Sequence, residues 1–575
     1  MKSAVNIPSV TWPKIRNIKT IQRLPAAINP AIVAQIAGTG LDSFDFVIVG
    51  AGSAGCVLAD RLTACGRHRV LLLEAGGTDR HPWVRLPIGY GKAFHNDRLN
   101  WRYRAAGSAG LGGREMYWPR GKVLGGSSSI NGLVWMRGLP HDFDDWERAG
   151  NPGWGWRDVA PVFDEVEQVG DGTDTVPRRV NVAARGQEYH PVRHHFMTAA
   201  ETIGLPHAPP HEAHMAEGVG PYSITTLMGL RHSAANAFLR PAMRRANLSV
   251  RKGVLVERVL FSGKRAVGVA YRDGDARHEV RAAGAVILAA GAVASPTLLQ
   301  RSGIGPSDLL SRFGIEQIHQ NAAVGAGLQD HLGVDYLFRT KQATLNQTLG
   351  TWTGRIKAAL QFLLTRDGPL SLSINQMGGL VRGTPDAREP DLQLYFSPLS
   401  YTTVHKNKRV LLKPDPWPGL SLGFNACRPT SQGRVDISSA DAAQPPRIAP
   451  NYLATTEDER ATIAGGRVLE QMLNTPALQA LIDRPNGFTP VDASDEAILA
   501  DFRARASTVF HACGTCRMAP EAAGGVVDPK LRVHGVEGLR VVDASIFPNI
   551  TSANTNAPTI MVAAKAAGDI LAGPD

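Results

Sequence analysis

Three closely spaced glycines and one acidic residue form the first group whose types and spacing predict chemistry. Gly50, Gly52 and Gly55 stand at the spacing G-x-G-x-x-G, and Glu74 follows in the same stretch. In such a motif the first glycine makes a tight turn, the second lets the backbone approach a pyrophosphate, and the third lets a helix pack on a strand. A carboxylate at Glu74 can accept hydrogen bonds from both adenosine ribose hydroxyls. The group predicts a site for FAD or NAD, and the acid disfavours the 2′-phosphate of NADP.

The elements that must position these residues are a strand, a helix and a second strand. Residues 44–49 are an apolar run typical of a buried strand, residues 54–64 are expected to form a helix, and residues 70–73 predict a strand that ends at Glu74. A helix N-terminus offers free N–H groups and a positive dipole end to phosphates. Besides the glycines and Glu74, the predicted cofactor-binding residues of this unit are Ser53, Ala54 and Ala75.

A second glycine-rich stretch, residues 118–132, carries serine, asparagine, one Arg and one Lys. Its backbone exposes many N–H groups, which suits a long polar ligand lying against it. Trp118, Ile130 and Trp135 are expected to anchor the stretch to a core, which a flexible linker rarely needs. The predicted cofactor-binding residues here are Arg120, Val123, Gly125, Ser128, Asn131 and Gly132.

The composition is that of a globular protein with more than one domain. The chain has 575 residues, of which 43% are hydrophobic and 20% charged, and this length exceeds one ordinary core. No apolar run is long enough to span a bilayer. The net charge is +11, but no basic stripe with interleaved aromatic residues is present, so nucleic-acid binding is not expected.

The first 41 residues differ from the rest because they contain basic but no acidic residues, together with four prolines. They lack the apolar core and the cleavage site of a secretory signal. We expect residues 1–43 to be an extension peripheral to function and the protein to be cytoplasmic. An organellar presequence and association with a membrane surface are the alternatives.

Histidines and cysteines raise the question of a metal site. Pro191 argues against a shared helix face for His190 and His194, and no ligand motif is complete. Cys513 and Cys516 form a C-x-x-C without a second pair, and five scattered cysteines argue against a disulfide framework. We expect no metal, and a redox role for the C-x-x-C pair is left open. The histidines of the stretch 150–240, expected to be irregular, include His190, His194, His195, His207, His211 and His214.

Two later segments return to the order of strand, turn and helix. Residues 285–291 predict a strand and turn before a helix at 295–301, and residues 539–542 predict a strand that ends at Asp543, before a helix at 558–571. Between these segments, residues 391–396 and 420–427 alternate like antiparallel strands, and residues 456–473 predict an amphipathic helix. The predicted cofactor-binding residues of these parts are Val256, Ala290, Gly291, Asp543, Ala544, Asn556, Pro558 and Thr559.

Four blocks of the sequence together resemble the glucose–methanol–choline family of FAD oxidoreductases, in particular its choline dehydrogenase and alcohol dehydrogenase branch. They are the glycine fingerprint, residues 121–131, residues 291–305, and a C-terminal block with His511-Ala-Cys-Gly514-Thr515, Asp543-Ala-Ser545 and Asn554-Thr-Asn556-Ala-Pro558-Thr559. The resemblance runs from about residue 44 to residue 571. It implies an α/β fold with a Rossmann-like FAD-binding domain and a substrate domain whose antiparallel sheet covers the flavin. We assign residues 44–149, 245–334 and 501–575 to the first domain, and residues 150–244 and 335–500 to the second.

The resemblance also implies the catalytic residues and the cofactor. The family's catalytic His and its His or Asn partner map onto His511 and Asn554. His511 would take the hydroxyl proton as general base, and Asn554, which cannot exchange protons, would orient the substrate oxygen. Some members bind FAD covalently through a His where this chain has Ile130, so we expect non-covalent FAD. Asn556 is expected to cap a helix whose positive end stabilises the reduced flavin.

The predicted function is oxidation of an alcohol, with a primary alcohol favoured, to an aldehyde by proton abstraction and hydride transfer to flavin N5. Electrons would pass to a quinone or cytochrome, or, as an alternative, to O2 in an oxidase. Two other readings use the same fold. One is a lyase with non-redox FAD that acts on hydroxynitriles, and the other is a light-driven fatty-acid decarboxylase. The sequence does not predict which alcohol is the substrate.

Overall fold

A seven-stranded sheet carries the glycine fingerprint. Its strand order is β10 (Leu248–Lys252), β2 (Val70–Glu74), β1 (Ser43–Val49), β13 (Ala276–Leu288), β12 (Arg265–Asp273) and β11 (Val254–Ser262), and β27 (Leu539–Val541) also pairs with β13. β10, β2, β1, β13 and β27 run parallel. β12 is antiparallel to both of its neighbours. The parallel strands therefore end at one edge of the sheet, which is where such sheets bind ligands.

The computed structural model describes residues 43–573 apart from residues 174, 175, 177, 209–215, 385, 407 and 408. The predicted extension, up to residue 42, lies outside the described residues, as do His211 and His214.

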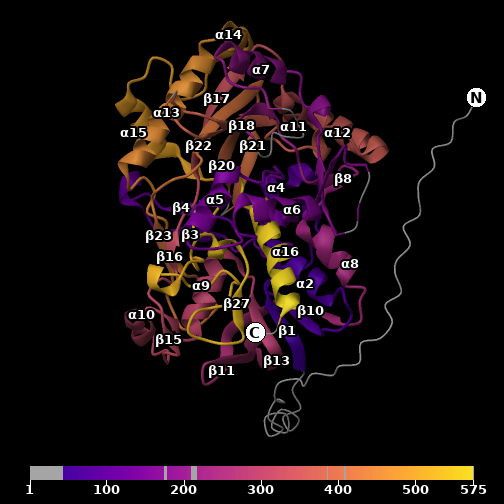
Figure 1. Cartoon of the computed structure of the whole chain (residues 1–575). Helices are drawn as coiled ribbons and strands as arrows, with labels where there is room; N and C mark the ends of the chain where they lie inside the picture. Colours follow the sequence, from indigo (N-terminus) through magenta and orange to yellow (C-terminus); the bar gives the residue numbers. More distant parts are fainter. Residues whose placement is uncertain are drawn as a thin grey trace, which may run out of the picture. The chain divides into compact units, whose positions relative to one another are not determined.

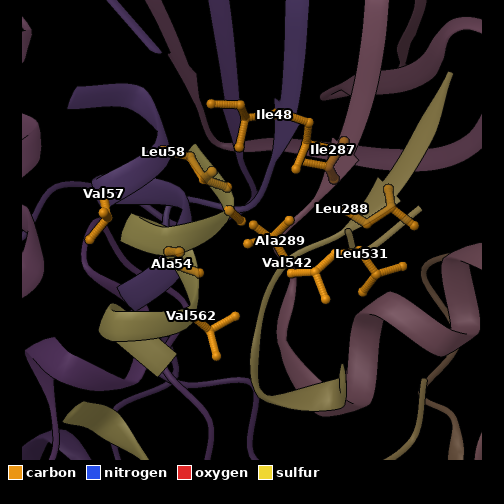
Figure 2. Packing of buried hydrophobic residues seen from close by; sticks show 14 of the residues in the cluster. Ile48, Ala54, Val57, Leu58, Ile287, Leu288, Ala289, Leu531, Val542 and Val562 are labelled. Atoms are coloured by element: carbon orange, nitrogen blue, oxygen red, sulfur yellow. The ribbon is translucent and has the colours of Figure 1, made fainter. Parts of the chain in front are cut away.

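Helices α2 (Ser53–Thr63) and α16 (Asn556–Ala572) pack against each other beside this sheet. Figure 2 shows Val57 and Leu58 of α2, and Val562 of α16, in one buried cluster with Ile48 and Ile287 of the strands. A Cβ on Gly55 would lie 1.8 Å from the carbonyl oxygen of Gly50, so only glycine allows α2 to start this close to β1. The predicted strand–helix–strand unit is confirmed.

A six-stranded antiparallel sheet forms the second large layer. Its order is β18 (Met377–Val381), β19 (Leu392–Ser397), β22 (Gly419–Ala426), β17 (Leu332–Thr340) and β25 (Ile482–Pro485), and β26 (Ser507–Thr508) also pairs with β17. Helix α13 (Thr456–Leu473) packs on β22 and has the predicted bounds. Figure 1 shows this sheet with α13 in the upper part of the view, and β1, β13 and β27 in the lower part. The predicted domain boundary after residue 334 falls inside β17, and the two-domain division stays a prediction.

The stretch 150–240 is more regular than expected. It contains α6 (Trp156–Val166) and α7 (Arg193–Thr202). Val159, Phe163 and Val166 lie at helical spacing on α6 and are buried. Pro161 lies inside this helix, and a proline there argues against a helix when only the sequence is known.

The remaining elements connect and cover these layers. The other helices are α3 (Pro82–Arg85), α4 (Tyr90–Ala93), α5 (Pro140–Arg148), α8 (Arg240–Ala242), α9 (Gly291–Arg301), α10 (Ser307–Arg312), α11 (Leu345–Gly350), α12 (Trp352–Thr365), α14 (Pro476–Leu481) and α15 (Asp495–Arg505). The other strands are β3 (Tyr103–Ala105), β4 (Met116–Trp118), β5 (Glu167–Gly170), β6 (Val180–Ala183), β7 (Gly218–Pro221), β8 (Thr226–Leu227), β9 (Leu230–Arg231), β14 (Ile304–Gly305), β15 (His319–Gln320), β16 (Ala326–Leu328), β20 (Tyr401–Lys406), β21 (Arg409–Pro414), β23 (Gly433–Asp436) and β24 (Arg447–Ala449). Among the helices of the described residues, none is both long and apolar enough to cross a membrane.

Candidate active site

A cavity of about 2440 Å³ extends from the carboxyl ends of the parallel strands to the antiparallel sheet. Gly55, Val123, Gly125, Ser128 and Pro558 do not line it, and their contact with a cofactor stays a prediction. The other predicted site residues all line this one cavity: Gly50, Gly52, Ser53, Ala54, Glu74, Ala75, Arg120, Asn131, Gly132, Val256, Ala290, Gly291, His511, Asp543, Ala544, Asn554, Asn556 and Thr559.

The glycines on this wall leave room for a ligand. A Cβ on Gly52 would meet only the carbonyl oxygen of Ala289, at 3.9 Å, and a Cβ on Gly291 would meet nothing within 4 Å. The backbone at both positions is therefore open to a bound group. Single ligands occupy roughly 300–1,000 Å³, so the cavity can hold a dinucleotide and a substrate together. The residues present fit FAD.

Glu74 is held at the end of β2 by two backbone donors. Its Oε2 accepts from the N–H of Ala51 at 2.8 Å, and its Oε1 accepts from the N–H of Gly76 at 2.7 Å. Burial raises the pKa of the Glu74 carboxyl, and the two backbone N–H groups oppose this rise. Each carboxylate oxygen keeps further acceptor capacity, which is what hydrogen bonds from ribose hydroxyls require.

Asp543 joins the end of β27 to the start of α9. Its Oδ2 accepts from the N–H of Gly291 at 2.8 Å and from Ser295 Oγ at 2.5 Å, and its Oδ1 accepts from the N–H of Ser545 at 2.8 Å. Burial raises the pKa of this carboxyl. Asp543 thus fixes two turns of the cavity wall against each other, and its own contact with the cofactor stays a prediction.

Asn556 does not act as the predicted helix cap. Helix α16 begins at Asn556 itself, and Thr555 stands in the capping position. The Asn556 Oδ1 instead accepts a hydrogen bond from Ser53 Oγ at 2.8 Å. The reason is tertiary: the first turns of α2 and α16 meet at the cavity, and the amide finds a partner on the neighbouring helix.

The predicted catalytic pair is close together on the cavity wall. Asn554 Nδ2 lies 3.1 Å from His511 Nε2, and Gln393 Nε2 lies 3.2 Å from Asn554 Oδ1. Because Gln393 donates to the amide oxygen, the NH2 group of Asn554 faces His511. His511 Nε2 is therefore the acceptor in this contact.

A second histidine, His331, determines the protonation of the His511 ring. His331 Nε2 lies 2.6 Å from the carbonyl oxygen of Cys427, and His331 Nδ1 lies 2.8 Å from His511 Nδ1. A carbonyl oxygen can only accept, so His331 Nε2 carries the hydrogen and His331 Nδ1 has a free lone pair. His511 Nδ1 must then donate to His331. This leaves the lone pair of His511 at Nε2, toward Asn554.

The electrostatics of the site keep both rings neutral. Burial lowers the pKa of His331 to about 4. The pKa of His511 lies well below its usual value because of burial first, and then because of His331 and the positive charge of Arg120. A neutral imidazole has a lone pair, here at His511 Nε2, that can accept a proton from a bound hydroxyl group.

The backbone of His511 is held by a buried carboxylate. Asp330 Oδ1 accepts from the N–H of His511 at 2.6 Å, and Asp330 Oδ2 accepts from Tyr452 and Thr508 hydroxyls, each at 2.5 Å. The preceding residue, Phe510, has φ of 70°, a left-handed conformation that costs energy in a bulky residue. The Asp330 contacts stabilise this turn and so aim the His511 ring.

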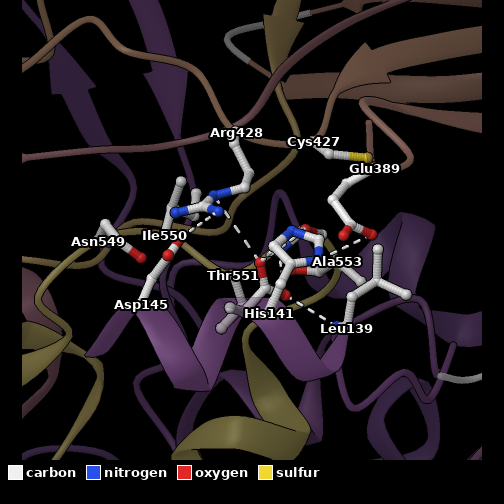
Figure 3. A network of polar contacts seen from close by, with 12 residues as sticks. Leu139, His141, Asp145, Glu389, Cys427, Arg428, Asn549, Ile550, Thr551 and Ala553 are labelled. Carbon is white, nitrogen blue, oxygen red and sulfur yellow. Dashed lines mark hydrogen bonds and ion pairs between the residues drawn. The ribbon is translucent and has the colours of Figure 1, made fainter. Parts of the chain in front are cut away.

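A polar network outside the cavity anchors the segment that precedes Asn554 (Figure 3). Asp142 accepts from the N–H of Leu139 at 2.8 Å, from the N–H of Ser552 at 2.8 Å and from Ser552 Oγ at 2.7 Å. Arg428, which follows Cys427, forms an ion pair with Asp145. Residues of α5 thus hold both the segment before Asn554 and the segment of Cys427, whose carbonyl oxygen binds His331.

The sequence reasoning missed His331, Asp330, Gln393 and Asp142. In the sequence, residues 324–331 (Val-Gly-Ala-Gly-Leu-Gln-Asp-His) have the composition of a turn. The signal available there was an adjacent Asp-His pair at the end of a glycine-rich turn, because two ionisable residues side by side in such a place merit attention. Gln393 and Asp142 lie in an ordinary strand and helix, and their role depends on long-range contacts that the local sequence does not show.

The C-x-x-C pair lies in the apolar core. Cys513 and Cys516 are free thiols with no exposed surface. Burial raises the pKa of both thiols, so the reactive thiolate is disfavoured. Within the described residues, no three His, Cys, Asp or Glu side chains are grouped to hold a metal ion.

Comparisons with known proteins show the family of this chain. Two models described as GMC oxidoreductase match residues 44–333 and 429–563. The chain is 37% identical to "Alcohol dehydrogenase [acceptor]" of Pseudomonas putida over 91% of this chain and 95% of that one. It is 38% identical to the mitochondrial choline dehydrogenase of Homo sapiens over 94% and 92%. A solved structure of pyridoxine 4-oxidase from Mesorbium loti has a TM-score of 0.81, with 29% identity, over 92% of this chain and 100% of that one.

The chain belongs to the GMC oxidoreductase family. It is a flavin oxidoreductase that uses FAD. The predicted α/β fold class is confirmed.

Proposed function

We propose that this enzyme oxidises a primary alcohol to an aldehyde, with His511 as general base and Asn554 as its hydrogen-bonding partner. The observation that carries the proposal is the His511–Asn554 contact of 3.1 Å on the cavity wall. The alcohol oxygen would bind within hydrogen-bonding reach of both His511 Nε2 and Asn554 Nδ2. His511 Nε2 takes the hydroxyl proton, and Asn554 donates a hydrogen bond to the alkoxide oxygen as its charge develops. FAD, when bound, supplies a hydride acceptor at N5.

The other cavity residues would bind and orient the FAD cofactor. Glu74 would accept hydrogen bonds from the adenosine ribose, and the N-terminal turns of α2 and α16, both on the cavity wall, would present N–H groups to the cofactor. Ile130 is buried and lines the cavity in the 118–132 stretch. Since an isoleucine forms no bond to a flavin, we propose that FAD is bound non-covalently.

The test is anaerobic stopped-flow reduction of the bound flavin by an alcohol panel. His511→Ala should slow flavin reduction by about 10²–10⁴-fold, while the FAD content stays that of the wild type. His278→Ala, at an exposed position on β13, is the matched control and should reduce normally. Near wild-type reduction in His511→Ala would contradict the base assignment. If no alcohol bleaches the flavin, the result would favour the hydroxynitrile lyase or the light-driven decarboxylase as the function.

We further propose a quinone or cytochrome as electron acceptor. The support is the similarity to the Pseudomonas putida relative named "Alcohol dehydrogenase [acceptor]". Reoxidation of the reduced enzyme by a soluble quinone should be faster than by air. Faster reoxidation by air would indicate an oxidase. The predicted cytoplasmic location stays a prediction.

A further inference from the structure

Helix α12 presents an apolar face to solvent. Of the side chains in Trp352–Thr365, only Ala358 and Phe362 are buried. At about 100° per residue, the exposed apolar residues fall within one arc of about 120°, opposite the buried pair. Leu364 is 82% exposed and Trp352 is 75% exposed, which is unusual for large apolar side chains grouped on one element. This set, which we call the α12 face, consists of Trp352, Ile356, Leu360, Leu363 and Leu364.

A neighbouring turn extends the α12 face. Met228, between β8 and β9, is 63% exposed. The next residue, Gly229, lies so close to the end of α12 that a Cβ there would be 1.9 Å from the carbonyl oxygen of Arg366. Figure 1 shows α12 at the outer edge of the molecule, with β8 below it in the view. A second exposed apolar side chain therefore stands in a turn that approaches the end of α12.

Positive charges border the α12 face on both sides. By the same helical spacing, Lys357 lies at one border and Arg355 lies toward the other. Arg366 caps the C-terminal end of the helix, with its guanidinium over the ring of Phe362. All three residues are exposed, and α12 contains no acidic residue. The nearest acid in the chain, Asp367, is paired with Arg185 at 2.7 Å. An apolar strip with flanking cations and a tryptophan matches the surface of a bilayer that contains anionic lipid.

We propose that the α12 face docks on a lipid bilayer that contains anionic headgroups. Ile356, Leu360, Leu363 and Leu364 would enter the boundary between headgroups and acyl chains. Their flanking cations would contact phosphate groups, since Lys and Arg keep their charged ends in the polar layer. The first 41 residues are a poorer occupant of this face, because they carry basic but no acidic residues and so have the same sign of charge.

The proposed docking surface adjoins the active-site cavity. Arg355 of α12 lines the cavity, and its Nε donates to the carbonyl oxygen of Leu349, another lining residue, at 2.6 Å. Trp352 lies about one helical turn before Arg355, and Ile356 directly follows it. Both are on the exposed side of the helix. A bilayer bound here would lie against this wall of the cavity. Lipid-soluble molecules concentrate in a bilayer, so they would be held close to the cavity.

The test is flotation of the FAD-loaded full-length enzyme with phosphatidylcholine vesicles, with and without phosphatidylglycerol. The wild type should float with the anionic vesicles, and added salt should weaken the binding. Leu363→Gln with Leu364→Gln should lower the bound fraction by roughly tenfold or more. Lys357→Gln should reduce only the part that depends on phosphatidylglycerol. Leu571→Gln, at an exposed leucine on α16, is the matched control and should bind as the wild type does.

Several outcomes would overturn the proposal. One is a wild type that does not float, and another is a double variant that floats as well as the wild type. A third is a wild-type dimer in analytical ultracentrifugation that the double variant converts to monomer while neither protein floats, which would assign the α12 face to a second copy of the chain. Flavin reduction by alcohol is measured on the same samples, and because vesicle binding and turnover are separate readouts, failure of one proposal is distinguishable from failure of the other.

Discussion

His331 Nδ1 accepts a hydrogen bond from His511 Nδ1 over 2.8 Å, and this single contact decides which nitrogen of His511 is the base. The chain of hydrogen bonds starts at the carbonyl oxygen of Cys427, an acceptor, which fixes the hydrogen of His331 at Nε2. The hydrogen of His331 in turn fixes the hydrogen of His511 at Nδ1, so the lone pair of His511 lies at Nε2, where it accepts from Asn554. His331 does not itself line the cavity and acts through His511, so it is a positioning residue.

Loss of the acceptor on His331 should slow catalysis without removing FAD. His331→Leu leaves the buried Nδ1–H of His511 without an acceptor, which costs about 1–3 kcal/mol. The rate of flavin reduction should therefore fall roughly ten- to hundredfold. His331→Asn places an amide oxygen near the lost acceptor and should recover part of the rate. Equal rates in the two variants would show that volume, rather than the hydrogen bond, matters at this position. The measurement is anaerobic stopped-flow reduction.

The pH dependence of kcat/KM should reflect the low pKa of His511. Burial, His331 and the Arg120 cation all lower the pKa of this ring below 6.5. A base with a lowered pKa stays unprotonated to lower pH, so the acid limb of the profile should lie below pH 6.5 and the profile should be flat above it. Arg120→Gln removes a cation that disfavours the imidazolium, so the pKa of His511 and the acid limb should move to higher pH.

The matched variant for this test is Arg120→Lys, which keeps the charge and should leave the limb nearly in place. A limb that moves equally in both variants would instead point to the lost hydrogen bond from Arg120 Nη1 to the carbonyl oxygen of Phe510 at 2.6 Å.

Two glycines of the fingerprint should separate folding from cofactor binding. In Gly55→Ala the new Cβ would lie 1.8 Å from Gly50 O, so we expect a loss of about 1–3 kcal/mol of stability, seen as a lower Tm of the apoprotein. In Gly52→Ala the protein has room, since only Ala289 O lies within 4 Å. The apoprotein Tm should then be unchanged, while the Kd for FAD rises about tenfold or more because the methyl group faces the cavity. An unchanged Kd for Gly52→Ala would argue against a cofactor pyrophosphate at this turn.

The linkage of FAD can be measured directly. After precipitation with trichloroacetic acid, the yellow colour should stay in the supernatant, because Ile130 provides no atom for a bond to the flavin. Colour in the pellet would mean that another residue holds FAD covalently, and mass spectrometry of a tryptic digest would identify it.

Local sequence was sufficient to predict the dinucleotide unit, since the apolar run of β1, the glycine spacing and Glu74 are all within 31 consecutive residues, Phe44 to Glu74. The helix bounds of α13 follow from amphipathic periodicity in the same way. Recognised blocks supplied His511 and Asn554, which the structure places 3.1 Å apart.

What only the tertiary structure decided is the environment of those residues. His331, Gln393 and Asp142 reach the site from a turn, a strand and a helix that are distant in sequence, and hydrogen bonds between such segments leave no local pattern. The tautomer of His511 depends on a carbonyl oxygen at Cys427, and every residue type has such an oxygen. The exposure of the apolar residues of α12 is likewise decided by tertiary structure, because only packing determines which face of a helix is left in water.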